Sequence, residues 1–178
     1  MSVTWEGQLL LFLQAHRSPF WDDLFSRFTH LGDAGLVFIT VGVLLLLFRP
    51  TRRAGGTVLL ALLIGLLITN VTLKPLVSRI RPFLEVPGLL PLVTENDSHS
   101  FPSGHACAAF AFASALWHTL PVRWGKRLAV AFAALMAFSR LYVGVHYPTD
   151  VLAGVLVGVL SGVLAHALLQ HLPSRKSN

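Results

Sequence analysis

The stretch Ala54–Leu73, AGGTVLLALLIGLLITNVTL, contains no acidic or basic side chain. A helix needs about 20 apolar residues to cross the hydrocarbon core of a bilayer, so this stretch is long enough to span it unaided. The rest of the chain has a matching composition, since 54% of its 178 residues are apolar and only 12% are charged. Soluble domains carry about 25% charged residues. We therefore expect a single-domain integral membrane protein, and its one cysteine excludes a disulfide framework or a cysteine zinc cluster.

Four further stretches have the composition of membrane spans, near residues 32–48, 105–122, 127–145 and 151–172. Residues 1–31 differ, because clustered charges and Pro19 interrupt their apolar side chains, and they predict two short amphipathic helices in the membrane interface. The sequence thus predicts an all-α fold. It is a polytopic membrane helix bundle of about five transmembrane helices, with residues 32–178 as one transmembrane domain and amino-terminal interfacial helices before it.

Basic residues set the expected orientation. With five alternating crossings, two connections and the carboxyl-terminal tail fall on one side, which holds eight basic and no acidic residues. The positive-inside rule places that side in the cytoplasm. We expect a multi-pass protein of the cell membrane. Its expected partner is the lipid bilayer, and no nucleic acid is expected. The eight residues are Arg49, Arg52, Arg53, Arg123, Lys126, Arg127, Arg175 and Lys176.

Four basic residues cluster on the opposite, outer side, where the topology rule disfavours them: Lys74, Arg79, Arg81 and Arg140. Converging cations suggest a bound anion, because guanidinium groups match phosphate oxygens and lysine offers a point charge. The alternative is that they form surface salt bridges with outer-loop carboxylates, and charge alone leaves both interpretations open. Those carboxylates are Glu85, Glu95 and Asp97.

Two further stretches favour the interpretation that the basic cluster binds an anion. Pro102-Ser103-Gly104-His105 leads directly into a span, where backbone amides and the helix dipole favour an anion and His105 could donate a proton. Ser139 to Asp150 ends the next span and includes Arg140 and His146. Asp150 is placed to accept the ring N–H of His146, which would leave the other ring nitrogen free as a nucleophile.

Together, these stretches resemble the three signature motifs of the phosphatidate phosphatase type 2 superfamily, which includes membrane lipid phosphatases and vanadium haloperoxidases. Motif one is Lys74 with Arg81-Pro82, motif two is Pro102 to His105, and motif three is Ser139-Arg140 with His146 and Asp150. Every specified position matches.

The resemblance implies a role for each motif residue. His146 would attack phosphorus and form a phosphohistidine, Asp150 would orient it, and His105 would protonate the leaving group and then activate water. The phosphoryl oxygens would be held by Lys74, Arg81, Ser103, Gly104 and Arg140. No Asp, Glu or His grouping has dinuclear metal spacing, so we expect metal-independent activity and no cofactor.

The expected substrate is a lipid phosphate or diphosphate. An outward-facing site favours undecaprenyl diphosphate, with phosphatidylglycerophosphate and phosphatidate as alternatives. Two alternatives from other functional classes remain open: a vanadate-dependent haloperoxidase and a non-catalytic membrane scaffold. Arg79 lies outside the motifs and is expected in packing or headgroup contact. Gly154, Gly158 and Gly162 predict a close helix-packing face, either within the bundle or between subunits of a homo-oligomer.

Overall fold

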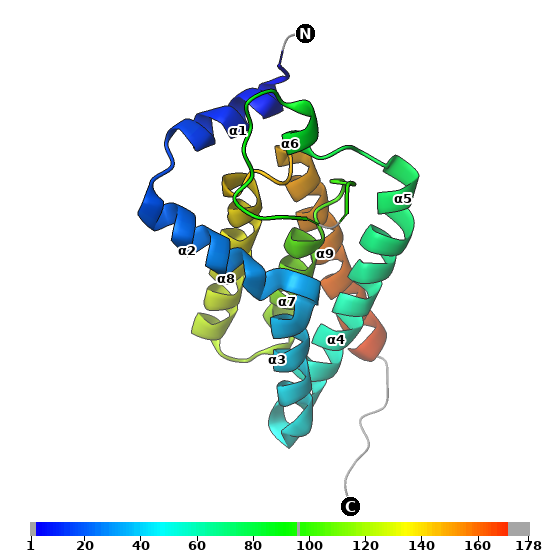
Figure 1. Cartoon of the computed structure of the whole chain (residues 1–178). Coiled ribbons are helices and arrows are strands. Elements are labelled where there is room, and N and C mark those ends of the chain that lie inside the picture. The colour runs from blue at the N-terminus through cyan, green and yellow to red at the C-terminus, as the bar shows by residue number, and fades with distance from the viewer. Residues whose placement is uncertain (1–2, 96, 171–178) are drawn as a thin grey trace, which may run out of the picture.

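The computed structural model describes residues 3–95 and 97–170, and helices dominate it (Figure 1). Within these residues no strand forms, and an isolated bridge joins Ile80 to His99. The all-helical prediction is confirmed, whereas Arg175, Lys176 and the end of the last predicted span lie outside the described residues. The α-helices are α1 Trp5–Ala15, α2 Pro19–Thr29, α3 Leu36–Leu47, α4 Arg52–Leu66, α5 Lys74–Val77, α6 Pro82–Glu85, α7 Gly104–Thr119, α8 Arg123–Tyr142 and α9 Pro148–Gln170.

The amino-terminal segment forms α1 and α2, separated at the predicted break. Thr4 caps α1 by accepting the Gly7 N–H at 3.3 Å, and α2 begins at Pro19, whose fixed φ suits a first helical turn. Their aromatic side chains Trp5 and Phe20 are exposed. The position of both helices at a membrane interface stays a prediction.

A sharp bend separates α2 from α3. The short 3-10 segment His30–Gly35 contains Asp33 with an extended backbone, and Ala34 and Gly35 both have positive φ. Glycine adopts a positive φ without steric cost, so Gly35 allows the chain to turn into α3. As a result α2 crosses the end of the bundle while α3 runs along it (Figure 1).

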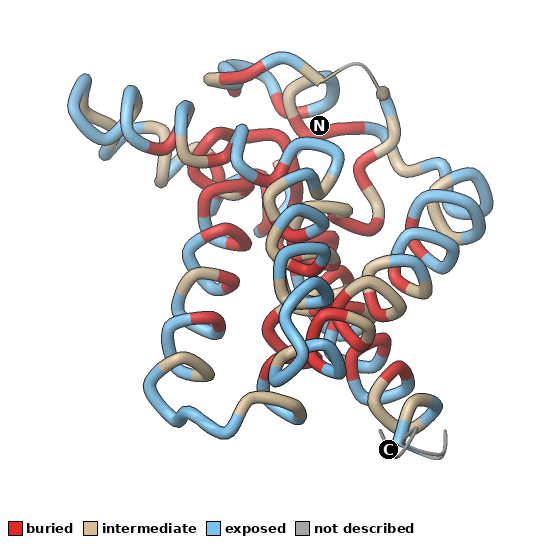
Figure 2. Tube along the Cα trace, turned by 90° about the horizontal axis from the view of Figure 1, so that it is seen from below, coloured by how far each residue is buried: buried red, intermediate tan, exposed pale blue. Residues whose placement is uncertain are grey.

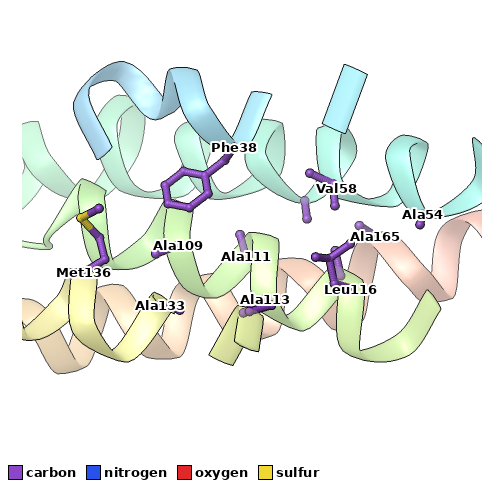
Figure 3. Close-up of a cluster of buried hydrophobic side chains, with 13 residues drawn as sticks. Phe38, Ala54, Val58, Ala109, Ala111, Ala113, Leu116, Ala133, Met136 and Ala165 are labelled. Atoms are coloured by element: carbon purple, nitrogen blue, oxygen red, sulfur yellow. The ribbon is translucent and has the colours of Figure 1, made fainter. Parts of the chain in front are cut away.

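Helix α7 is the centre of the bundle and packs against α4, α8 and α9. It is rich in alanine, and Figure 3 shows Ala109, Ala111 and Ala113 in the core near Phe38 of α3. Small side chains let helix backbones approach closely.

The glycines of α9 complete this packing. Gly154, Gly158 and Gly162 all face α7 of the same chain, and a Cβ on Gly158 would lie 2.9 Å from the backbone nitrogen of Ala111. The structure therefore shows the first of the two alternatives, packing within the bundle. Because α7 of the same chain covers these glycines, they are packed within the bundle, and a homo-oligomer stays a prediction.

The outward faces of the bundle are apolar. Figure 2 shows that buried residues face inward and exposed residues outward, and the exposed ones include Leu47, Leu63 and Leu152. Among the described residues, three helical runs are long and apolar enough to cross a membrane, the first of which includes the bend between α2 and α3: Pro19–Leu47, Arg49–Val77 and Pro148–Gln170. The five expected spans correspond to α3, α4, α7, α8 and α9. A run long and apolar enough to span has at least 18 residues, with no more than two charged side chains in an apolar stretch of that length. Helix α7 is too short at 16 residues, and α8 carries four basic side chains.

The end of α4 departs from the regular helix that the sequence predicts. Residues Leu67–Leu73 form a π-helix, a wider turn that is frequent at functional sites. Within it, the Thr69 hydroxyl donates to the carbonyl of Gly65 at 2.7 Å. Asn70 and Lys74, at this widened end, both line the cavity described next.

Candidate active site

The three motifs meet at one end of the bundle, near α5, α6 and the turn between α8 and α9 (Figure 1). Backbone hydrogen bonds join them. The Ser100 N–H donates to the Arg79 carbonyl at 2.7 Å, and the Ser103 N–H donates to the Asp150 carbonyl at 3.0 Å. The loop between α6 and α7 (residues 86–103) is thereby attached to motif one, and motif two is attached to motif three.

Two arginines lie buried here. Arg81 and Arg140 are each 1% exposed. Arg81 donates from Nη1 to the Val145 carbonyl at 3.0 Å and lies 3.4 Å from Nε2 of His146. Arg140 donates from Nη1 to the Thr29 hydroxyl at 2.6 Å. Charges removed from water require anionic partners or strong hydrogen bonds, and both arginines have such partners within the chain.

Carboxylates of the loop between α6 and α7 form ion pairs with the basic side chains that were predicted to bind phosphate. Glu95 pairs with Arg140 and with Arg81, where Oε2 and Nη2 are 3.2 Å apart. Asp97 lies 2.5 Å from Nζ of Lys74. Of the two alternatives left open by the sequence, the structure shows the carboxylate pairing. It is not a surface pairing for the two arginines, because Glu95 reaches into the interior to meet them.

Both loop carboxylates are held in their charged form. Burial raises the pKa of Glu95, but the charges of Arg140 and Arg81 outweigh it and hold the pKa below its usual value. Burial likewise raises the pKa of Asp97, and the hydrogen bond from Lys74 leads the contacts that bring it below its usual value. At neutral pH these carboxylates therefore compensate the cation cluster.

His146 lies in the turn between α8 and α9 and is 2% exposed. Its Nδ1 is 3.7 Å from Oδ2 of Asp150, so the predicted hydrogen bond between them is not formed in this structure. Among the described residues Nδ1 has no hydrogen-bond partner. Burial, with the charges of Arg140 and Arg81, lowers the pKa of His146 well below its usual value. The imidazole is therefore neutral at pH 7, the form that a nucleophile requires.

His105 projects from the first turn of α7 onto a carboxylate that the sequence analysis missed. Its Nε2 is 3.0 Å from Oδ1 of Asp33, whose Oδ2 lies 2.8 Å from Nδ1 of His30. The close approach requires Gly32, since a Cβ there would overlap the His105 ring. The available signal was an acidic residue next to the first apolar run, at Leu31-Gly32-Asp33.

The other motif-two residues differ in their placement. Ser103 is fully buried, and its hydroxyl faces its own helix, accepting from the Ala106 N–H at 3.5 Å. Its predicted contact with phosphate stays a prediction. Gly104 lines the cavity, where a Cβ would lie 3.3 Å from Oδ1 of Asn70.

A cavity of about 390 Å³ opens onto most of these groups. Its polar end is formed by five of the predicted site residues: Lys74, Arg81, Gly104, His105 and His146. Arg140 lines an adjoining polar cavity with Glu95 and Asp97, while Ser103 and Asp150 lie behind the wall. The opposite end is apolar and is lined by Ile39, Leu59, Leu62, Leu63 and Leu66 of α3 and α4. One cavity thus has a polar end with cationic side chains and an apolar end.

Of the two roles expected of Arg79, packing and headgroup contact, the structure shows packing within the chain. Arg79 lines neither cavity and instead contacts Asp150 and Glu6, a residue of α1 to which the sequence analysis gave no role. Glu85 is likewise away from the cations and accepts from the Tyr147 hydroxyl at 2.9 Å.

Within residues 3–95 and 97–170, no group of three or more His, Cys, Asp or Glu side chains is arranged to hold a metal ion. Metal-independent activity stays a prediction.

Similarity to known proteins agrees with this geometry. An undecaprenyl-diphosphatase of Sulfolobus acidocaldarius is 38% identical over 118 residues, which cover 66% of this chain and 56% of that protein. A lipid A 4'-phosphatase of Bacteroides thetaiotaomicron is 32% identical over 162 residues, 84% of this chain and 70% of that one.

A crystal structure of a transmembrane PAP2-type phosphatidylglycerolphosphate phosphatase from Bacillus subtilis superposes with a TM-score of 0.76. It is 30% identical, with 96% of this chain and 87% of that chain covered. The sequence model of the PAP2 superfamily matches residues 54–173, which include all three motifs. The chain belongs to the PAP2 superfamily.

Proposed function

We propose that this protein is a membrane lipid phosphatase that transfers the phosphoryl group of a lipid phosphate first to His146 and then to water. The observation that carries the proposal is the two-ended cavity, in which buried cations and two histidines lie at one end and leucines of α4 line the other. A lipid phosphate has the same division between charged head and hydrocarbon. Family membership supports a phosphatase, and the exposed apolar faces of the bundle support a membrane location.

The proposed reaction begins with attack by His146. Its Nε2, which faces Arg81, forms a bond to phosphorus while the bond from phosphorus to the leaving oxygen breaks. That oxygen is the bridging oxygen of a lipid diphosphate, which leaves as lipid monophosphate, or the lipid alkoxide oxygen of a monophosphate. His105 gives a proton to the departing oxygen. His105 then takes a proton from water as that water attacks phosphorus, breaks the P–N bond and releases phosphate. Phosphoryl transfer depends mainly on positioning and on compensating the charge of the equatorial oxygens, the role we assign to Lys74, Arg81 and Arg140.

The proposed substrate is undecaprenyl diphosphate, and the site is proposed to face the extracytoplasmic side of the cell membrane. Outer-loop residues form one wall of the site, and the similar Sulfolobus protein is named an undecaprenyl-diphosphatase. Phosphatidylglycerophosphate is the second candidate because the Bacillus structure, named for that activity, matches 96% of this chain.

Phosphate release from a panel of lipid phosphates tests the proposal, comparing wild type with His146→Ala. Loss of the nucleophile is expected to lower kcat by more than about 1,000-fold. His118→Ala, at the far end of α7, is the matched control and should keep full activity. Full activity in His146→Ala would refute the mechanism, and no release from any lipid phosphate by the wild type would refute the phosphatase proposal. Retained activity after a chelator would support the prediction of metal independence.

A further inference from the structure

Hydrogen bonds to both oxygens of the Asp150 carboxylate determine how it lies beside His146. Asp150 is fully buried at the start of α9. Its Oδ2 accepts the Tyr147 N–H at 2.8 Å, and its Oδ1 accepts from Nη1 of Arg79 at 2.7 Å. Because a carboxylate rotates about its Cβ–Cγ bond, the Arg79 contact limits where Oδ2 can lie relative to Nδ1 of His146. Arg79 thus fixes the plane of the carboxylate.

Arg79 is itself held on several sides. Its Nη2 lies 2.6 Å from Oε2 of Glu6, its Nη1 donates to the Thr149 hydroxyl at 2.7 Å, and its guanidinium carbon is 3.9 Å from the centre of the Tyr147 ring. Oε1 of Glu6 accepts from the Thr149 hydroxyl at 2.7 Å and from its N–H at 3.1 Å. These contacts use the planar fork of arginine, which lysine does not reproduce.

The same network includes α1, through Glu6. A helix that only needed attachment could rely on apolar side chains, as α1 does with Leu10, which is 1% exposed. Burying a carboxylate costs desolvation energy that only well-placed partners offset. Glu6 is 8% exposed, and its partners are Arg79 and the residue preceding Asp150.

We infer that Arg79 is a positioning residue for the His146–Asp150 pair and that Glu6 of α1 holds Arg79 in its working orientation. The inference rests on the proposed role of His146 as nucleophile. It makes the amino-terminal helix, which precedes the residues matched by the family, part of the apparatus that supports catalysis.

Steady-state kinetics of Arg79→Gln, Arg79→Lys and Glu6→Gln in detergent test the inference. Misplacing a reacting group by an ångström can cost about 100-fold, so we expect kcat of Arg79→Gln to fall about 10- to 100-fold. The KM and the inhibition constant of inorganic phosphate should change less than about threefold, because Arg79 lies outside both cavities. Arg79→Lys should recover little, and Glu6→Gln should show a smaller loss of the same kind. Arg27→Gln is the control, since its pair with Asp23 is exposed, and it should match wild type.

Two results would overturn the inference. One is a kcat of Arg79→Gln within twofold of wild type. The other is a loss of phosphate affinity as large as the loss of kcat, which would mark a general structural role. Rapid-quench measurement of phosphohistidine supplies a second readout, because slower formation at unchanged phosphate affinity is expected only of a positioning role. His146→Ala in the same assay separates the two proposals: if it stays active, the proposed function fails first.

Discussion

Each of the two site histidines lies near a carboxylate, but the two pairs differ. His146 is 3.7 Å from the buried Asp150, whereas His105 is 3.0 Å from the more exposed Asp33. The hydrogen bond with Asp33 orients the ring of His105, which suits the proton transfer proposed for it. The longer separation, with two arginines near His146, favours a neutral ring, which suits the proposed nucleophile.

Replacing Asp33 by asparagine should therefore weaken the proposed acid–base step. The amide side chain would keep the shape but remove the charge that favours protonated His105, and kcat should fall about 10-fold or more, as expected when general acid–base catalysis is impaired. The pH dependence of kcat should change as well. Steady-state assays at intervals of about one pH unit, from about pH 5 to about pH 9, would measure this change. Asp23→Asn, in an exposed pair on α2, is the matched control. An unchanged rate in Asp33→Asn would exclude Asp33 from this step.

At this scale the sequence predicted that motif residues lie together but not which contacts hold them. Lys74, Arg81, His105 and His146 do gather around one cavity. The partner Asp33 could not be predicted, because its contact with His105 joins positions 72 residues apart and depends on the bend after α2. Nor does spacing alone reveal that the Asp150 oxygens are taken by other donors.

Among the elements, the loop between α6 and α7 is anchored by hydrogen bonds at Leu90 and Leu92 and carries two carboxylates after that anchor. The Leu92 N–H donates to the Val143 carbonyl at 3.0 Å, and Nη1 of Arg17 donates to the Leu90 carbonyl at 2.7 Å. Beyond this anchor, Glu95 and Asp97 contact the cations that are proposed to hold phosphate. A phosphoryl group that uses the same cations must compete with these carboxylates.

Glu95→Gln should therefore bind inorganic phosphate more tightly. A hydrogen bond to a charged group is worth about 1.5 kcal/mol or more, so the inhibition constant of phosphate should fall about tenfold. Phosphate should also raise the Tm of this variant more than that of wild type, because the two buried arginines then depend on it. Glu85→Gln is the control, since Glu85 contacts Tyr147 instead of these cations. Unchanged or weaker inhibition in Glu95→Gln would show that Glu95 does not compete.

The contact between α7 and α9 offers a stability prediction. An alanine at Gly158 would force its Cβ against the backbone of α7, 2.9 Å from the nitrogen of Ala111. Overpacking of this kind costs about 1–3 kcal/mol, so Gly158→Ala should lower the free energy of unfolding in detergent by that amount. At Gly56 of α4 an alanine would meet only ordinary contacts at 3.8 Å or more, and Gly56→Ala should be neutral or stabilising. Equal stability of the two variants would contradict this account of α9 packing.

For the whole molecule, composition and apolar run length predicted the helical architecture well. Each predicted span coincides with a helix, because each carries enough apolar surface to require burial or lipid. What composition did not predict is local backbone geometry. The π-helix at Leu67–Leu73 and the bend at Asp33 are departures from regular helix that the length of an apolar run does not encode. These two irregular segments contribute Asn70 and Asp33 to the cavities.

Charge is divided between the two ends of the bundle. The turns after α3 and after α7 lie at the end away from α6 (Figure 1). The helices that begin there carry Arg52 and Arg53 in α4 and Arg127 in α8, and residues 48–53 and 120–127 include no acidic residue. The described acidic residues Glu6, Glu95 and Asp97 belong to the opposite end, with the candidate site. This division is what the positive-inside rule expects of a protein whose site faces outward.

Cysteine labelling of intact cells tests the proposed orientation. Ser98→Cys places an exposed thiol in the outer loop, and Pro121→Cys places one in the connection between α7 and α8. A membrane-impermeant maleimide should label the first variant in intact cells and the second only after the cells are opened. Wild type is the matched control, because its Cys107 is buried and should stay unlabelled. The reverse pattern, with Ser98→Cys protected until the membrane is opened, would place the site on the cytoplasmic side and remove the main argument for undecaprenyl diphosphate.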